Sequence, residues 1–256
     1  FKQYVSLTDG AQDDRIDIVN NVNWQSTDAL LKAEFPLSFS NPEAVYDLGV
    51  GTVARGNNTP TAYEVYAQQW ADLTAQDGSY GVAVMNDSKY GWDKPADNTI
   101  RLTLLHTPST RGGYSYQDRQ DFGEHVFTYS ITGHEGDYRK GDVTRKAEVL
   151  TQPLQAFVAP KHKGTYGRSF SFAESLNENV ALRALKQAED SDHVILRLFE
   201  AKNQRTETTL TFGKNVESAY LCNLLEQTEG ELEVKNGQIT IPVKPYEIIT
   251  LKLTLR

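Results

Sequence analysis

Histidine and carboxylate side chains are the groups in this sequence that suggest chemistry first, and that chemistry is metal binding. His106, His125 and His134 lie on or beside expected strands, and carboxylates stand close to two of them at Glu124 and Asp137. Separate strands can bring such side chains together in space. The residues lack the short, regular spacing that is typical of zinc ligands, however, so a structural role for each histidine is the stronger interpretation.

A second candidate site is a polar corner between two expected strands. Residues 82–85 (VAVM) have the length and β-branched content of a buried strand, and residues 86–91 (NDSKYG) are types that turn a chain. The next strand alternates apolar and polar residues from Ile100 to Leu104, which gives it one dry face. The corner is therefore expected at the rim of a sheet. Four of its side chains can face a cleft or a partner: Asp87, Lys89, Tyr90 and Trp92. The alternative is an Asx-type turn, in which the polar side chains bond their own backbone.

The segment after this strand, residues 106–121, is long, polar and rich in glycine and tyrosine. Loops of this length inside a compact domain are usually either functional or mobile. Tyr114 and Tyr116 lie on it, and together with Trp92 they supply aromatic side chains of the kind that bind sugars. A stand-alone carbohydrate-binding β-sandwich module is therefore one hypothesis for the function. Another is a purely structural interaction domain, which would carry a large exposed apolar patch.

Size, charge and cysteine content narrow the class of protein. The 256 residues include 26 lysines and arginines against 34 aspartates and glutamates, for a net charge of −8. This sign argues against nucleic acid or an anionic membrane as a partner, because both select basic surfaces. No run approaches the roughly 20 apolar residues of a membrane helix, so we expect a soluble protein. The single cysteine, Cys222, lies in an apolar run and is expected to be a buried small hydrophobe.

The remaining periodicity is that of an all-β protein with one short helix. A hairpin is expected over residues 2–22 around an acidic turn at 9–14, and Pro36 marks an edge in the strand over 30–37. The helix begins after Asp142 as its N-cap, has apolar positions at helical spacing, and ends before Pro153.

A domain boundary is expected within the basic, glycine-containing stretch 160–170, so the predicted domains are 1–165 and 166–256. The second domain shows seven short strands, typical of a small antiparallel sandwich. They are predicted over residues 180–188, 194–200, 208–212, 216–224, 231–234, 238–243 and 248–255.

Several motifs fall in an order that resembles a known family. They are the runs at 30–37 (LLKAEFPL), 81–91 (GVAVMNDSKYG), 102–105 (LTLL), 125–129 (HVFTY) and 134–137 (HEGD). Together they are similar to the C-terminal β-region of glycoside hydrolase family 38, the zinc-dependent retaining α-mannosidases. The resemblance extends from about Trp24 to the leucine-rich end. It implies a large antiparallel β-sandwich, of the mutarotase-like supersandwich kind, followed by a smaller β-sandwich.

The resemblance also implies that the catalytic residues and the metal ligands lie in a different domain from this chain. In that family a His-x-His-x-Asp run in an upstream α/β barrel supplies metal ligands, and this sequence contains no such run. We therefore expect no catalytic residue and no metal ligand in this chain, with zinc bound outside it. The first residue is Phe rather than Met, as expected for a fragment. Its partners would be the upstream catalytic barrel of the same polypeptide and a mannose-containing glycan.

In this view the chain braces the barrel, lines part of its sugar cleft and is inactive alone. The implied pocket-rim or barrel-contact residues are Asn86, Asp87, Lys89, Tyr90 and His106. Family members often have arginine at the position of His106, which weakens the case for a substrate contact there.

Overall fold

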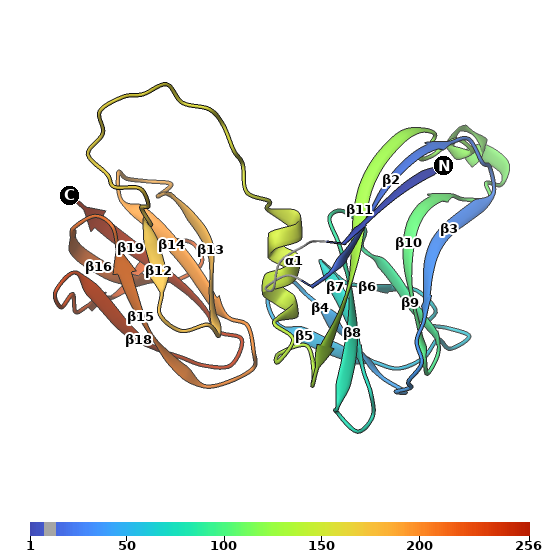
Figure 1. Ribbon diagram of the computed structural model, residues 1–256, viewed down its shortest axis with the longest axis horizontal. Coiled ribbons are helices and arrows are strands. Elements are labelled where there is room, and N and C mark those ends of the chain that lie inside the picture. Colours follow the sequence, from blue (N-terminus) through green and yellow to red (C-terminus); the bar gives the residue numbers. More distant parts are fainter. Residues whose placement is uncertain (8–13) are drawn as a thin grey trace. The chain divides into compact units, whose positions relative to one another are not determined.

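The computed structural model describes residues 1–7 and 14–256 (Figure 1). Most of the expected acidic turn at 9–14 lies outside the described residues. The chain divides into two compact units, Phe1–Gln155 and Ala156–Arg256. No helix or strand occurs from residue 152 to residue 172, and the expected boundary after residue 165 falls inside this connecting segment.

The first unit is built from two antiparallel sheets. In spatial order, the larger sheet consists of β1 (Lys2–Leu7), β2 (Ile16–Trp24), β11 (Gly123–Glu135), β8 (Tyr80–Asn86), β7 (Trp70–Thr74), β4 (Ala44–Asp47) and β5 (Thr52–Arg55). The smaller sheet consists of β3 (Ala29–Pro36), β10 (Thr99–Thr107), β9 (Gly91–Ala96) and β6 (Val65–Tyr66). Pro36 thus ends an edge strand, as its lack of a backbone donor predicts.

The two sheets bury one shared core. Ile18, Tyr46 and Val84 enter it from the larger sheet, and Ile100 and Leu102 enter it from the smaller one. The alternation of β10 places Arg101 and Thr103 on the opposite, outer face of the small sheet. This arrangement confirms the expected large antiparallel β-sandwich.

A single α-helix, α1 (Val143–Thr151), follows the last strand of this unit. Val143 and Ala147 pack in a separate apolar cluster with Trp70, Met85 and Tyr138, so the helix covers the side of the larger sheet that faces away from the core. Trp70 is completely buried there, and its ring centroid lies 5.0 Å from that of Tyr138.

The start of this helix differs from the expectation. Asp142 occupies the N-cap position but has a left-handed backbone, with φ of 51°, and its side chain makes no capping hydrogen bond. The carboxylate instead pairs with Arg145, whose Nε lies 2.5 Å away. Packing of Val143 and Ala147 against the sheet therefore contributes more to this helix than a side-chain cap does.

The second unit is a smaller sandwich of two antiparallel sheets. One sheet consists of β12 (Ala173–Ser175), β15 (Thr206–Phe212) and β18 (Gln238–Val243), and the other of β13 (Val180–Gln187), β14 (Val194–Glu200), β19 (Ile248–Leu255), β16 (Val216–Cys222) and β17 (Thr228–Leu232). Their inner faces share a core that includes Leu198, Leu210, Ile239 and Leu251. Cys222 is buried and free, as expected.

The sequence misses one strand of this unit, β12. Its three residues, Ala173–Ser175, are too few and too polar to show a period of two, and they become a strand only because β15 pairs with them.

No helix among the described residues has the length and apolarity needed to cross a membrane.

Candidate functional site

The polar corner connects the two sheets of the first unit, because β8 belongs to the larger sheet and β9 to the smaller one. Asn86, at the end of β8, is buried. Its Oδ1 accepts a hydrogen bond from the backbone N–H of Lys89 at 2.5 Å, and its amide donates to the carbonyls of Gln68 and Gln69 at 3.2 and 3.3 Å. The side chain of Asn86 therefore holds the turn together and is turned away from the surface.

Asp87 fixes the corner to the neighbouring strand β11. Its Oδ2 accepts the backbone N–H of Thr128 at 2.8 Å, and its own N–H donates to the Thr128 carbonyl at 3.1 Å. Ser88 donates to the other carboxylate oxygen at 2.7 Å. The residue remains exposed, so its carboxylate is fixed in position and still reachable from outside.

Lys89 and His106 each interact with Asp121, which lies at the end of the long loop. Asp121 accepts the backbone N–H of His106 at 3.0 Å through Oδ2. Burial lowers the pKa of Lys89, while the negative charges of Asp121 and Asp87 oppose that change. The Lys89 ammonium lies 4.4 Å from the ring centroid of Phe127, within the range of a cation–π contact.

The remaining corner residue, Tyr90, is half-exposed and stands beside the similarly exposed Tyr66. Their ring centroids are 6.4 Å apart with 30° between the planes. The hydroxyl of Tyr66 also accepts a hydrogen bond from the amide of Gln68. The corner thus presents an aromatic surface next to its charged groups.

Strand direction places all of these residues at one end of the unit. β8 ends and β9 begins at the corner, where Asn86 pairs with Tyr129 of β11, and the end of β10 and the start of β11 extend beyond it. The loop from residue 108 to residue 122 starts at the same end and contains the 3-10 helix η1 (Gly112–Gln117). Tyr114 and Tyr116 project from η1 with 63% and 74% of their surface exposed.

Trp92 does not belong to this surface, contrary to the expectation that it lies on a loop. It is the second residue of β9, it is fully buried, and it packs in the shared core. The strand β9 already begins at Gly91, the last residue of the expected turn, so Trp92 is a strand residue and points inward. The set of three exposed aromatic side chains that would favour a sugar-binding module is therefore reduced to two.

The three histidines considered as metal ligands are not brought together. His134 is buried, and its Nε2 lies 2.6 Å from Oδ2 of Asp72. His125 contacts the backbone carbonyl of Asp121 through Nε2 at 2.6 Å. Within residues 1–7 and 14–256, no three histidine, cysteine, aspartate or glutamate residues lie close enough to hold a metal ion. The described residues therefore do not fit a zinc ion.

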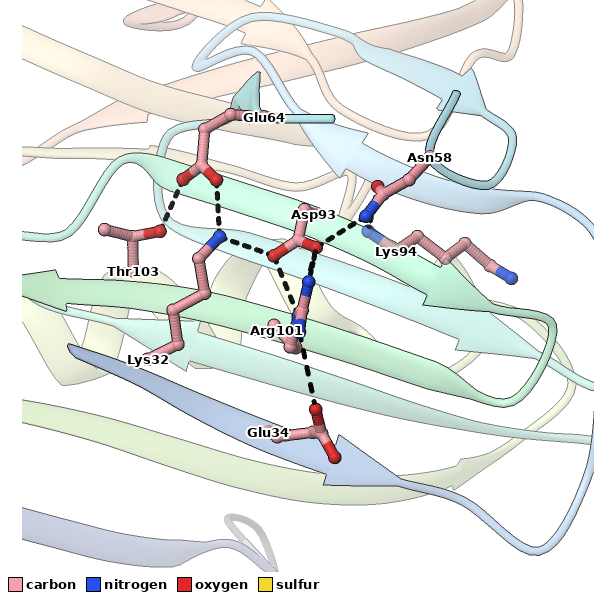
Figure 2. Close-up of polar contacts among 8 residues, drawn as sticks. All are labelled: Lys32, Glu34, Asn58, Glu64, Asp93, Lys94, Arg101 and Thr103. Carbon is pink, nitrogen blue, oxygen red and sulfur yellow. Dashed lines mark hydrogen bonds and ion pairs between the residues drawn. The ribbon is translucent and has the colours of Figure 1, made fainter. Parts of the chain in front are cut away.

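Sequence reasoning overlooked a charged network on the outer face of the small sheet (Figure 2). At its centre is Asp93, whose side chain is fully buried. Oδ1 accepts from Lys32 at 2.6 Å, and Oδ2 accepts from Arg101 at 2.5 Å and from Asn58 at 2.7 Å. Glu64 extends the network by contacting both Lys32 and Thr103, and Glu34 lies 3.7 Å from Arg101.

This network is unsuited to acid–base catalysis. Burial alone raises the pKa of Asp93, but hydrogen bonds from Arg101, Lys32 and Asn58 outweigh it, so the pKa is lower than usual. A carboxylate that stays ionised and has both oxygens engaged cannot deliver a proton near neutral pH. A structural role follows. The alternation of β10 in the sequence already placed Arg101 on the outer face of the small sheet. It did not show that Asp93 would be its partner.

Comparison with known proteins agrees with the architecture. Residues 1–111 match the model of the glycosyl hydrolases family 38 C-terminal domain, and residues 179–251 match that of the family 38 C-terminal beta sandwich domain. A crystal structure of an α-mannosidase from Enterococcus faecalis aligns over 94% of this chain and 27% of its own, with a TM-score of 0.79 at 21% identity. This likeness shows the fold.

Two curated relatives extend the comparison. Alpha-mannosidase 2C1 of Mus musculus is 31% identical over 246 residues, which are 92% of this chain and 23% of the relative. Alpha-mannosidase G of Dictyostelium discoideum is 28% identical over 249 residues, 93% of this chain and 22% of the relative. The chain thus spans about a quarter of the length of these relatives. It belongs to glycosyl hydrolase family 38, as a C-terminal β-region of that family.

Proposed function

We propose that this chain is the C-terminal, non-catalytic β-region of a retaining α-mannosidase that removes terminal α-mannosyl residues from glycans. The observation that carries the proposal is the partial coverage. Curated relatives named α-mannosidases align with almost the whole chain but are about four times as long. In this proposal the catalytic barrel and its zinc ion lie in the part of the polypeptide that precedes the matched region.

The proposed role of the chain is to brace that barrel. Strand β1 supports it, because β1 pairs with β2 along one side and no strand among the described residues pairs with its other side. All six of its residues are exposed, and the neighbours Tyr4 at 57% and Val5 at 68% point to opposite faces of the strand. Exposed apolar side chains on both faces of a strand favour contact with another protein surface.

The corner end of the unit is proposed to line the sugar cleft. Asp87 and Lys89 supply fixed charged groups there, and Tyr90 supplies an exposed ring. His106 stands at the same end through the bond between its backbone N–H and Asp121. Such groups can accept and donate hydrogen bonds to sugar hydroxyls and can pack against the apolar face of a pyranose ring.

Hydrolysis of an aryl α-mannoside tests the proposal. The 256-residue chain with added zinc should show no turnover, the separately expressed upstream region should be weakly active, and mixing the two should restore activity. Val5→Lys with Leu7→Lys should reduce this restoration at least tenfold. Leu185→Lys in the second unit, which also replaces a half-exposed leucine, serves as the matched control and should restore fully. Turnover by the chain alone would refute the non-catalytic role.

A further inference from the structure

The second unit contains a hollow of about 400 Å³ beside its edge strand β12. The residues that lead into β12 form one side of the hollow, and β12 with the end of β15 forms the other. The residues that line it include Ser169, Phe170, Ser171, Glu174, Thr211 and Gly213. Leu210 points into the core of the unit, so its neighbour Thr211 points outward and the hollow opens on the outer face.

An aromatic wall is fitted into this hollow. A Cβ atom at position 213 would lie 2.3 Å from the carbonyl oxygen of Ser171 and 2.5 Å from Cε2 of Phe170. Only glycine therefore allows the Phe170 ring to rest against the backbone of the β15 end. The ring of Tyr166 lies beside it, with centroids 4.2 Å apart and 38° between the planes. Phe170 lines the hollow and is 43% exposed, and Tyr166, which packs on it from outside the lining, is 58% exposed.

Free polar groups line the rest of the hollow. Glu174 and Thr211 are directly opposite each other in the pairing of β12 with β15, which places their side chains on the same face. The Glu174 carboxylate makes no ion pair or hydrogen bond with any described residue. The hydroxyls of Thr211, Ser169 and Ser171 likewise have no bonded partner among the described residues. One carboxylate and three hydroxyls are therefore available to a ligand.

This combination fits a neutral pyranose. The C–H bonds on one face of a pyranose are weakly positive and pack against the negative face of an aromatic ring. Neighbouring sugar hydroxyls can donate to one carboxylate and exchange hydrogen bonds with protein hydroxyls. The volume of the hollow also lies in the range of small-ligand sites. A quaternary ammonium ion would use the rings and the carboxylate but would leave the three hydroxyls unmatched.

We propose that this hollow binds one mannopyranose unit of a glycan, at a secondary site that takes no part in hydrolysis. The pyranose class follows from the lining residues. The choice of mannose rests on the proposed function, because a mannosidase handles glycans that carry several mannose units. Such a site would hold one branch of the glycan to the protein and raise the local concentration of the others.

Titration of the 256-residue chain with methyl α-mannoside, followed by saturation-transfer NMR and calorimetry, tests this inference. Saturable binding is expected. Glu174→Gln and Thr211→Val keep the shape of the side chain and remove a hydrogen-bonding group, and each should weaken binding about tenfold without changing the melting temperature. Glu207→Gln is the matched control, because Glu207 lies on the same strand and face as Thr211 but outside the hollow. This control should bind as the unchanged chain does.

Three results would overturn the inference. They are unchanged binding by both hollow variants, equal weakening by the Glu207 control, and displacement of the sugar by tetramethylammonium at lower concentration. Equal binding of methyl α-glucoside would support the pyranose site and refute the choice of mannose. Binding is measured here without hydrolysis, so failure of this site and failure of the mannosidase assignment are separate outcomes.

Discussion

Asp93 and Arg101 face each other across the paired strands β9 and β10, with the guanidinium Nη2 2.5 Å from the carboxylate Oδ2. The carboxylate is fully buried, while 30% of the arginine side chain remains exposed. Together with Lys32, this pair joins β3, β10 and β9 on the outer face of the small sheet. A charge network takes the place of apolar packing on this side of the sandwich.

Replacing Asp93 by asparagine should destabilise the first unit by about 2–4 kcal/mol. The change leaves Lys32 and Arg101 without their shared anion, and loss of one partner of a buried pair costs about 3–5 kcal/mol, reduced here because both cations are partly exposed. Urea unfolding measures the effect. Glu34→Gln is the control, because Glu34 is exposed and 3.7 Å from Arg101, and it should cost less than about 0.5 kcal/mol. Equal effects would show that the network does not stabilise the fold.

The contribution of Asp93 should disappear in acid. Its pKa in the folded chain is lower than usual, because the hydrogen bonds from its cationic partners outweigh burial. An aspartate in an unfolded chain has a pKa of about 3.9, so the stabilisation is complete above about pH 4 and is lost as the pH falls through the lower folded pKa. The gap in unfolding free energy between the unchanged chain and Asp93→Asn should therefore shrink below about pH 4. A gap that widens in acid would contradict the assigned charge state.

Gly81→Ala should destabilise the larger sheet by about 1–3 kcal/mol through overpacking. The added Cβ would lie 2.4 Å from Cε1 of His134, and that ring is held by its bond to Asp72. Thermal unfolding of the first unit measures the loss. Gly230→Ala is the matched control in a strand, because nothing lies within 4 Å of its Cβ position. The control should be neutral or slightly stabilising, and a similar loss for both variants would point to a general effect of alanine in these strands.

Lys89→Met in the intact enzyme should lower kcat/KM for an aryl α-mannoside about tenfold, if the corner lines the sugar cleft as proposed. Methionine keeps the apolar stem against Phe127 and removes the ammonium group, so the melting temperature should change little. Lys163→Met, on the exposed connecting segment, should change neither quantity. Unchanged kinetics for Lys89→Met would place the corner outside the substrate site.

Periodicity in the sequence was enough to predict an all-β chain with a small terminal sandwich, whereas the large sandwich was predicted from the family resemblance. The strands Val194–Glu200, Gln238–Val243 and Ile248–Leu255 occur with the predicted bounds. The first is a mostly apolar and buried run, and the second alternates strictly between solvent and core. Burial of Cys222 also followed from its apolar neighbours.

The sites were less predictable, since they depend on pairing between distant segments. Lys32, Glu64 and Asp93 belong to three different strands or loops, and nothing local in the sequence relates them. The sequence predicted that Asn86 belongs to a turn. It did not predict that Asn86 is buried, because its amide donates to the carbonyls of Gln68 and Gln69 from a distant segment. The placement of Trp92 depended on where β9 begins, because a strand that starts at Gly91 includes Trp92 in the sheet and buries its ring in the core.

The open side of β1 has a consequence for handling the protein. A strand with unpaired backbone donors and acceptors and apolar side chains on both faces is a template for a further strand. When nothing else covers it, two copies of the chain can pair edge to edge there and continue into larger aggregates. A lysine placed on this strand, or a proline that removes one of its outward donors, would keep the separated β-region monomeric at high concentration.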